Sequence, residues 1–407
     1  MPGASETLAS FLPRIALDAL RGEPAPAAPD ALEIVGALLF ADIHDFTGLT
    51  LDMARRGNAG PELIVELLNA CFDRIIVEVT SHGGDVLEFD GDAVIALWRA
   101  ADGDQALADA TATAERCARA SQVAVQQASV NLRIGLAAGP MFLTRIGGSQ
   151  GRWIFLVSGA PFEEVGRVSR TTRPGDVACL DRTRSLVKRG RPALRREGPH
   201  HAPVPPDAQL IPYLPDILVR RVAAGRFAWI SELRTVSIVF LILRELDGAR
   251  PDDRTKIQSA TVSVQQALDV WDGVLNQMLL DDTGHVLLAA FGLPSMSHED
   301  DPTRATLAAL AIERALSDQR LSFSIGVTTG WAYCGAYGNE RRRRYAIVGD
   351  TVNLAARLAQ HARQGLLTDA TTATEANSRI AFEARPPMTL KGRREPTPVF
   401  APQRTDW

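Results

Sequence analysis

Cysteine is scarce in this 407-residue chain, and its placement argues against two common kinds of stabilisation. The four cysteines, Cys71, Cys117, Cys179 and Cys334, lie far apart and never in CxxC spacing. Neither a zinc cluster nor a disulfide framework is therefore indicated, and a reducing, cytoplasmic environment fits best. The histidines likewise show no HExxH pattern or other paired ligand spacing.

Long apolar runs and a strong excess of one charge are also missing. No stretch of 18 or more apolar residues occurs, which argues against a membrane-spanning helix. The first 30 residues contain Glu6 and only Arg14 and Arg21 as basic residues, so they do not resemble a signal peptide. A net charge of −4 offers no general attraction to nucleic acid or to anionic membranes. We therefore expect neither as a partner.

Two similar halves account for most of the chain. With 46% hydrophobic and 23% charged residues, its 407 residues can hold two domains with sizeable cores. The matching stretches are VSIVFLIL at 236–243 with GALLFADI at 36–43, VLLAAFG at 286–292 with AVIALWR at 93–99, and FSIGVTTG at 323–330 with LRIGLAAG at 132–139. Offsets of roughly 190 to 200 residues indicate a duplicated domain, not a short-period solenoid.

Each half predicts the same order of elements. In the first, apolar residues at helical spacing over 61–80 are followed by Gly83-Gly84, an Asp-Gly hairpin and a second helix over about 103–124. Two strand-like stretches, VNLRIGLAAG and WIFLVSG, come next. This order predicts an α+β fold, a split βαβ, ferredoxin-like sheet with helices on one face.

Composition marks the joins between these units. Apolar residues between Leu8 and Leu20 predict one amphipathic helix, and the linker GEPAPAAPD follows it. The stretch RGRPALRREGPHHAPVPPDAQ at 189–209, rich in Arg, Pro and His, marks the join of the two domains. We therefore expect an N-terminal helix and linker at 1–31, a first domain at 32–205, a connector at 206–230 and a second domain at 231–407.

FADIHDFT at 40–47 and LEFDGDAVIALW at 87–98 carry the most chemical information. An apolar run that ends at Asp42 predicts a buried strand with a carboxylate at its carboxyl end, followed by a loop and a helix start. Asp90-Gly91 between two apolar runs predicts a hairpin, with Asp92 just past its tip. Two such carboxylates beside free helix N–H groups suit a two-metal phosphoryl-transfer site, although either alone would more often be a cap or turn residue.

The second half lacks this carboxylate pair. Ile242 corresponds to Asp42, and His285 corresponds to Asp92. A copy with these residues cannot hold the metal ions through carboxylates at the two positions.

Other polar groups distinguish the second half in turn. GDTVNLAARLA at 349–359 places Asn353 and Arg357 four residues apart, and therefore on one face of a helix. Glu163 and Arg167 are their counterparts in the first half. An isolated NxxxR spacing is about as often an exposed helix face. Each half thus carries half a site, which predicts that the copies pack face to face around one working and one degenerate site.

These motifs support a family resemblance. FADIHDFT followed by LEFDGDAVIALW resembles the metal-binding half of class III nucleotidyl cyclases, and nearly the whole chain resembles the tandem catalytic domains of bicarbonate-responsive soluble adenylyl cyclases. The resemblance implies two ferredoxin-like cyclase domains paired as an intramolecular pseudo-heterodimer. It implies a cytoplasmic, monomeric adenylate cyclase that makes cyclic AMP from ATP with two divalent cations, Mg²⁺ or Mn²⁺.

The resemblance also assigns roles to individual residues. Asp42 and Asp92 resemble the two carboxylates that bridge the metal ions, and Ile43 resembles the backbone carbonyl ligand. Asn353 resembles the group that orients the ribose, and Arg357 resembles the group that stabilises charge on the α-phosphate. The residues expected to contact the phosphates are His44, Asp45, Phe46, Thr47, Arg133 and Lys391.

The base-binding positions depart from the family. The family selects adenine with a Lys in the hairpin of the second copy and an Asp or Thr before the IxG motif. Here those positions are identified as Gln277 and Ala346, with Ile347 beside the latter. Gln277 could still pair with a purine edge through its amide.

The degenerate site departs from the family as well. Glu88 stands where the bicarbonate-binding Lys would be, and Gly166 where the Arg would be, with Arg167 one residue beyond. A carboxylate is a poor host for an anion, so no bicarbonate response is expected.

Three other functions stay open from the sequence. A pseudo-cyclase could bind nucleotide as a regulatory module without turnover, and a cyclase could prefer another base. The chain could also be an interaction platform, for which the N-terminal helix and the run Arg341 to Arg344 would be the evidence. We expect that run to be a solvated hairpin tip, with binding to an acidic partner as the alternative.

Overall fold

The first half of the chain is built around one long central strand. In the computed structural model, which describes residues 3–21, 29–45, 60–126, 130–194, 204–225, 232–294, 296–362, 364–390 and 395–403, this strand is β1 (Asp30–Ile43). It pairs antiparallel with β3 (Ala93–Arg99) and with β4 (Leu132–Gly147). The sheet order is β2-β3-β1-β4-β5, and β6 runs parallel to β4. This confirms the ferredoxin-like order expected from the sequence.

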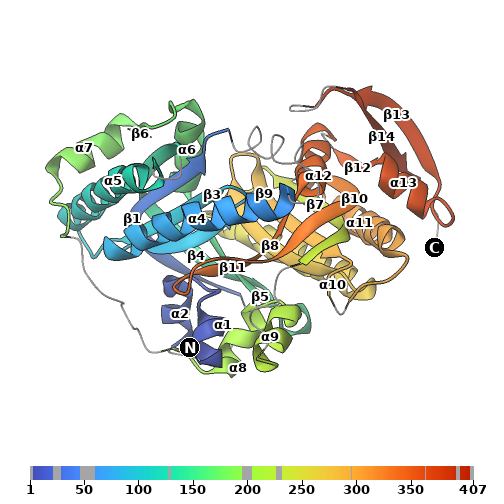
Figure 1. Cartoon of the computed structure of the whole chain (residues 1–407), viewed down its shortest axis with the longest axis horizontal. Helices are drawn as coiled ribbons and strands as arrows, with labels where there is room; N and C mark the ends of the chain where they lie inside the picture. The colour runs from blue at the N-terminus through green and yellow to red at the C-terminus, as the bar shows by residue number, and fades with distance from the viewer. Residues whose placement is uncertain are drawn as a thin grey trace.

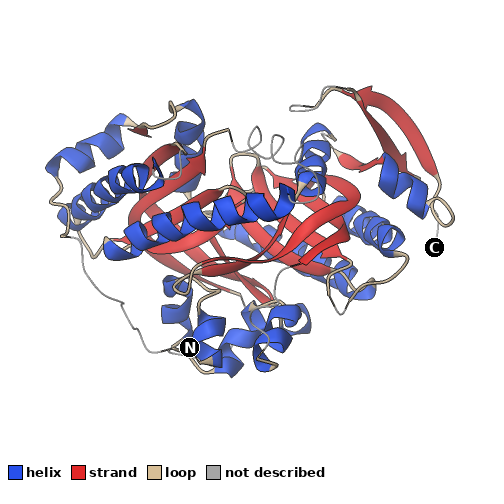
Figure 2. Cartoon of the chain, in the orientation of Figure 1, coloured by secondary structure: helices blue, strands red, loops and turns tan. Residues whose placement is uncertain are grey.

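The remaining elements of this half follow the predicted order. They are α4 (Gly60–Ser81), β2 (Asp85–Asp90), α5 (Asp104–Gln126), β5 (Trp153–Ser158), α6 (Ala160–Thr171), β6 (Val177–Cys179) and α7 (Asp181–Arg189). Figure 2 shows the helices in blue against the strands of the sheets in red.

Successive side chains of β1 point to opposite faces of the first sheet. Leu39 and Ile43 are buried in one apolar cluster with residues of α4 and α5, whereas Leu38 joins a different cluster with Phe162 of α6. The expectation of helices on one face is therefore wrong for α6. Gly135 of β4 permits this packing, because a Cβ there would lie 2.6 Å from the carbonyl oxygen of Val165.

The second half repeats the same sheet. Its elements are β7 (Glu232–Arg244), α10 (Pro251–Val270), β8 (Val274–Asp281), β9 (Gly284–Phe291), α11 (Asp301–Asp318), β10 (Ser322–Gly338), β11 (Arg343–Val348), α12 (Asp350–His361), β12 (Gly365–Asp369), α13 (Ala370–Ala376), β13 (Phe382–Met388) and β14 (Thr397–Pro402). Phe240 pairs with Gly326 as Phe40 pairs with Gly135. The register therefore confirms the duplication. Strands β13 and β14 extend the second sheet beyond the strands that repeat the first sheet (Figure 1).

The two halves contact each other through equivalent pairs of residues. The N–H of Gly338, at the end of β10, donates to Asn69 Oδ1 on α4 at 3.1 Å. The N–H of Gly147, at the end of β4, donates to Gln258 Oε1 on α10 at 2.8 Å. The β4-β5 ribbon and the β10-β11 ribbon thus each contact the first long helix of the other half. The halves are related by an approximate two-fold axis.

Short helices from two distant parts of the chain pack together beneath the sheets in Figure 1. They are α1 (Ala4–Ala9), α2 (Arg14–Leu20), α8 (Asp207–Leu210), the 3₁₀ turn Ile211–Tyr213 and α9 (Asp216–Ala223). Leu8 and Leu20 share an apolar cluster with Leu214 and Leu218. The single N-terminal helix expected from the sequence is wrong, because Pro13, which lacks an N–H, separates α1 from α2. In the described ranges no helix combines the length and apolarity needed to cross a bilayer.

Candidate active site

Asp42 lies at the carboxyl end of β1, as the apolar run predicted. It pairs with Ala93 of β3 on one side and with Arg133 of β4 on the other. Burial raises the pKa of Asp42 to about 6, and the positive charge of Arg133 opposes this shift. The predicted phosphate contact Arg133 therefore lies beside the predicted metal ligand, and its Nε atom is buried without a partner among the described residues.

Asp92 lies in the turn between β2 and β3, next to the end of β1. The N–H of Ile43 donates to the carbonyl oxygen of Asp92 at 3.3 Å, which joins the two segments directly. Burial, followed by the negative charges of Asp42 and Asp90, raises the pKa of Asp92 to about 8. The structure thus brings together the three residues predicted to bind metal, Asp42, Ile43 and Asp92.

A third carboxylate in this group was missed from the sequence. Asp90 ends β2, and burial raises its pKa to about 7, with further contributions from the charges of Asp281 and Asp42. In the sequence, Asp90-Gly91 is a strong hairpin signal and therefore indicates a turn residue at Asp90. The sequence DGD could have suggested a second carboxylate, but Asp281 belongs to the other half of the chain and no local pattern points to it.

These carboxylates form a half-buried acidic cluster that suits divalent cations. Burial raises the pKa of all three carboxyl groups, and the charge of Asp42 adds to the shift at Asp90 and Asp92, so their ionised forms are costly without a nearby positive charge. Carboxylate and carbonyl oxygens are the donors that Mg²⁺ and Mn²⁺ prefer. Within the described ranges, no three His, Cys, Asp or Glu side chains are arranged so that they could hold a metal ion by themselves. The fit therefore rests on the donor chemistry of Asp42, Ile43 and Asp92.

A pocket of about 150 Å³ adjoins this cluster. Its walls come from β1, β2, β3, α6, the end of β8 and the turn that follows β8: Phe40, Asp42, Asp90, Ile95, Phe162, Val165, Gly166, Ser169, Arg170, Leu280, Asp281 and Asp282. Gly166, predicted for the degenerate site, thus lies in the same pocket as Asp42. Arg167 is exposed and does not line this pocket.

Asn353 and Arg357 lie on α12, four residues apart as predicted. α12 packs closely on β10 because Gly326 has no side chain: a Cβ there would lie 2.1 Å from the carbonyl oxygen of Ala355. Asn353 is exposed, and Arg357 is partly buried and donates to Gln360 Oε1 at 3.1 Å. For the part of the chain that the structure describes, no hydrogen bond or ion pair joins either side chain to the aspartate cluster.

The other predicted phosphate contacts are only partly described. The N–H of His44 donates to the carbonyl oxygen of Asn131 at 2.9 Å, and its Nδ1 atom is buried without a partner among the described residues. Asp45 is exposed, with a positive φ of 57°. Phe46, Thr47 and Lys391 lie outside the described residues.

The predicted base contacts come from two strands of the second half. Gln277 pairs with Leu288 beside a bulge in β8, as Glu88 pairs with Ile95 beside a bulge in β2. Its amide Nε2 donates to the carbonyl oxygen of Phe89 at 2.7 Å. Ala346 is buried against the core of the first half, whereas Ile347, on the opposite face of β11, packs in the cluster that contains the N-terminal helices.

Comparison with known proteins identifies the family. The model of the adenylate and guanylate cyclase catalytic domain matches residues 32–203 and 240–401. The chain belongs to this family. Both halves are therefore class III cyclase domains, arranged in tandem.

Two curated relatives match nearly the whole chain. Adenylate cyclase type 10 from Rattus norvegicus is 27% identical over 439 residues, and the Homo sapiens protein of the same name is 25% identical over 437 residues. Each match covers 93% of this chain but only 27% of the relative, so the chain spans about a quarter of the length of those proteins.

A solved structure shares the tandem fold. A class III adenylyl cyclase-like ATP-binding protein from Pseudomonas aeruginosa superposes with a TM-score of 0.59, covering 91% of this chain and 92% of its own. At 11% identity, this similarity shows the arrangement of the cyclase fold alone.

The second cyclase domain replaces the carboxylate cluster by other residues. Ile242 and Leu279 both pair with Val286, as Asp42 and Asp90 pair with Ala93. These apolar residues pack together with Ala359 of α12. His285, at the position of Asp92, is fully buried, and burial lowers its pKa to about 4. No carboxylate therefore occupies the three positions in this domain.

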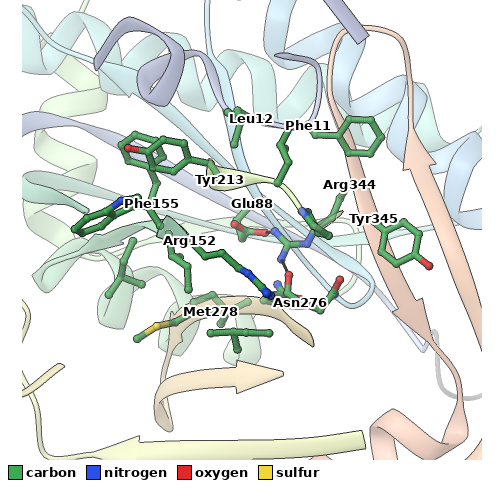
Figure 3. A pocket seen from close by; sticks show the side chains of 18 of the residues that line it. Phe11, Leu12, Glu88, Arg152, Phe155, Tyr213, Asn276, Met278, Arg344 and Tyr345 are labelled. Carbon is green, nitrogen blue, oxygen red and sulfur yellow. Dashed lines mark hydrogen bonds and ion pairs between the residues drawn. The ribbon is translucent and has the colours of Figure 1, made fainter. Parts of the chain in front are cut away.

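Glu88 of the first cyclase domain has a cationic partner that the sequence did not indicate. It forms an ion pair with Arg344, whose guanidinium also donates to the carbonyl oxygen of Asn276 at 3.1 Å. Figure 3 shows these three residues around one cavity of about 160 Å³, which Phe155 and Tyr213 also line. Burial lowers the pKa of Arg344 to about 9.

The arginine run is also not a solvated hairpin tip. Arg341 is exposed, but Arg342 is only 4% exposed and donates hydrogen bonds to backbone carbonyls of the other domain. Arg343 and Arg344 are partly buried. The expectation of a solvated charge run is therefore wrong, because carbonyl oxygens and Glu88 replace water around most of these side chains.

Proposed function

We propose that the chain is a class III adenylate cyclase that converts ATP to 3′,5′-cyclic AMP and pyrophosphate, a lyase reaction used in signal transduction. The observation that carries the proposal is the contact between Ile43 and Asp92, which joins the two carboxyl-bearing segments of the first domain. The second domain lacks these carboxylates and instead supplies Asn353 and Arg357. The name of the type 10 relatives, adenylate cyclase, supports an adenine nucleotide as the substrate.

Each residue has a role in this reaction. Asp42, Ile43 and Asp92 would hold two divalent cations, which would supply Lewis-acid activation of the ribose 3′-OH and neutralisation of the triphosphate. Asn353 orients the ribose, and Arg357 stabilises negative charge as the 3′-oxygen bonds to the α-phosphorus and pyrophosphate leaves. Arg133 and Lys391 bind phosphate oxygens. The base lies near Gln277, Ala346 and the backbone of Ile347.

The assay that tests this function compares two nucleotides and two metals. Purified protein is incubated with ATP or GTP in the presence of Mg²⁺ or Mn²⁺, and the cyclic nucleotide is quantified by mass spectrometry. Formation of cyclic AMP at several turnovers per protein supports the proposal. Binding of ATP without any cyclic product would identify a pseudo-cyclase instead.

Base preference is the part of the proposal in which the chain departs from its family. Gln277 already donates its amide N–H to Phe89, which leaves its Oε1 atom as an acceptor, whereas Ala346 offers no polar side-chain group. A nucleotide-binding module or a cyclase for another base is therefore the second candidate. The tandem Pseudomonas structure, which is named as an ATP-binding protein, is a precedent for the first of these.

Replacing Gln277 by Ala should reduce the discrimination between ATP and GTP. Loss of one hydrogen bond to a purine edge costs about tenfold in relative kcat/KM. The measurement is kcat/KM for both nucleotides, with Asn276→Ala as the neighbouring control. An unchanged ratio in Gln277→Ala would remove Gln277 from the base site.

Bicarbonate should not stimulate the enzyme, although the physical reason differs from the one derived from the sequence. Arg344 is already bonded to Glu88 and to the carbonyl oxygen of Asn276, and Gly166, which lines the other pocket beside Asp42, has no side chain. Neither position therefore offers a free cation to an added anion. Activity is measured against added bicarbonate with chloride as the control at fixed pH. Saturable activation at millimolar concentrations would contradict this prediction.

We also propose that the protein is a cytoplasmic monomer. The contacts of Gly338 with Asn69 and of Gly147 with Gln258 pair the two cyclase domains within one chain. A second chain is therefore not needed to complete the shared site. The domain limits at residues 31, 205 and 230 are part of this proposal.

A further inference from the structure

The strand that leads to Asp92 lies at an edge of its sheet. β2 pairs with β3 on one side only, so its other edge presents backbone groups that need partners. Those partners come from outside the first sheet. Gln277 binds the carbonyl oxygen of Phe89, and Arg342 binds a carbonyl oxygen nearer the start of the strand, that of Leu87. Arg344 pairs with the side chain of Glu88 on the same strand.

Arg342 makes the most connections along this edge. Its Nε and Nη2 atoms donate to the carbonyl oxygens of Val86 and Leu87, both at 2.8 Å, and its Nη1 atom donates to that of Phe11, also at 2.8 Å. The register of β2 shifts between Val86 and Glu88, and one guanidinium reaches both consecutive carbonyls at this irregularity. The guanidinium also lies 5.5 Å from the centroid of the Phe89 ring.

The N-terminal helices bind the start of the same strand. The backbone N–H groups of Arg14 and Ile15, in the first turn of α2, donate to the two carboxylate oxygens of Asp85 at 2.9 and 2.8 Å. Asp85 therefore satisfies the free N–H groups at the start of α2. Together, Asp85 and Arg342 join three parts of the chain: the N-terminal segment, the hairpin that bears Asp92, and the second domain.

The equivalent position on the other hairpin lacks this arrangement. By the register of the two β-ribbons, Arg152 corresponds to Arg342. The guanidinium of Arg152 forms an ion pair with the carboxylate of Asp269 on α10 at 3.4 Å. The backbone of Arg152 bonds to Gln265, Gly148 and Ser149, so none of these contacts involves a carbonyl of β8. If the contact were needed only to pair the two cyclase domains, an equivalent arginine would bind the β8-β9 hairpin as Arg342 binds the β2-β3 hairpin. Arg342 instead binds the hairpin that carries Asp92.

We propose that Arg342, supported by Asp85, is a positioning residue that fixes the metal-binding hairpin against the N-terminal helices and the second domain. The catalytic part of this inference rests on the proposed cyclase function, whereas its structural part does not. Asp92 lies five residues beyond Leu87, so motion of β2 is transmitted to the carboxylate. A displacement of about 1 Å in such a group can cost about a hundredfold in rate.

The test compares Arg342→Lys with Arg152→Lys in the full chain. Lysine keeps the positive charge, but a single ammonium cannot reproduce a fork that reaches three carbonyl oxygens. Amide hydrogen exchange is followed by mass spectrometry in residues 85–99 and, as an internal reference, in residues 274–291. We expect Arg342→Lys to speed exchange in 85–99 by about tenfold or more and Arg152→Lys to leave it unchanged.

Cyclase kinetics supply the second measurement. We expect Arg342→Lys to lower kcat by about tenfold or more while the KM for the nucleotide changes little, because the hairpin holds metal ligands and not the base. Unchanged exchange in 85–99, or faster exchange with wild-type kcat, overturns the positioning role. Faster exchange in a protein whose wild type has no turnover overturns the proposed function but supports the structural contact.

A second variant covers the case in which Arg342→Lys does not fold. Asp85→Asn keeps the size of the side chain and one acceptor oxygen, but it loses one of the two bonds to the first turn of α2. The same faster exchange in 85–99 and the same loss of kcat are expected, at smaller magnitude. Wild-type values for both measurements in this variant overturn the proposal.

Discussion

Asparagine in place of Asp42 or Asp92 should abolish formation of cyclic nucleotide and leave the fold intact. Asparagine has nearly the same size but lacks the negative charge that a divalent cation requires at each position. The expected loss in kcat is about a thousandfold or more, which corresponds to about 4 kcal/mol of transition-state stabilisation. Activity within a few-fold of wild type in either variant would contradict the assignment of the metal site.

The same substitutions should not lower thermal stability in the presence of a chelator. Burial raises the pKa of Asp42 from 3.8 to about 6, and burial together with the charges of Asp42 and Asp90 raises the pKa of Asp92 from 3.8 to about 8. An acid whose folded-state pKa is raised loses stability as the pH rises from its unfolded pKa through its folded pKa, so these ionised carboxylates destabilise the metal-free fold at pH 8. Asp102→Asn, at an exposed aspartate of the same domain, is the control for both measurements.

The parts of the site that depend on local pattern could be predicted from the sequence. The apolar run before Asp42 specified a strand end, and Asp90-Gly91 specified a hairpin that places Asp92 at its turn. The helical spacing of Asn353 and Arg357 was equally local. Because both halves repeat the pattern, the absence of Asp42 and Asp92 equivalents could be read from the second half directly.

Features that depend on contacts between the halves could not be predicted in this way. Arg342 belongs to a run of four arginines, and such runs are usually solvated. Its acceptors, the carbonyls of Val86 and Leu87, lie about 250 residues away in the chain and are free only because β2 is an edge strand. The pKa shift of Asp90 likewise depends in part on a residue of the other half, Asp281.

The break in the N-terminal helix has a local signal in the sequence, Pro13, but the helical spacing of the apolar residues favoured a single helix. Apolar residues from Leu8 to Leu20 are spaced for one helix, but Pro13 cannot supply the N–H that a continuous helix needs at that position. The structure uses the break. Phe11 turns its carbonyl oxygen toward Arg342, and α2 begins after Pro13 with its first N–H groups on Asp85.

Replacing Arg357 by Ala should lower kcat far more than it raises the KM for the nucleotide. The proposed partner of Arg357 is negative charge that grows only as the α-phosphorus becomes five-coordinate, so binding of the ground state loses little. The exposure of Asn353 and the single side-chain hydrogen bond of Arg357, to Gln360 on its own helix, leave both groups available to a bound nucleotide. Arginines that stabilise such charge contribute about a thousandfold or more to phosphoryl transfer.

The measurement of this effect is steady-state kinetics of Arg357→Ala and Arg357→Lys beside Arg167→Ala. Arg167 occupies the equivalent position on α6, is exposed, and should tolerate removal with kcat close to wild type. Lysine at position 357 keeps the charge but not the planar fork, so kcat should recover only in part. If KM rose in Arg357→Ala while kcat held, Arg357 would be a ground-state contact to the triphosphate, and the charge on the α-phosphate would need another partner.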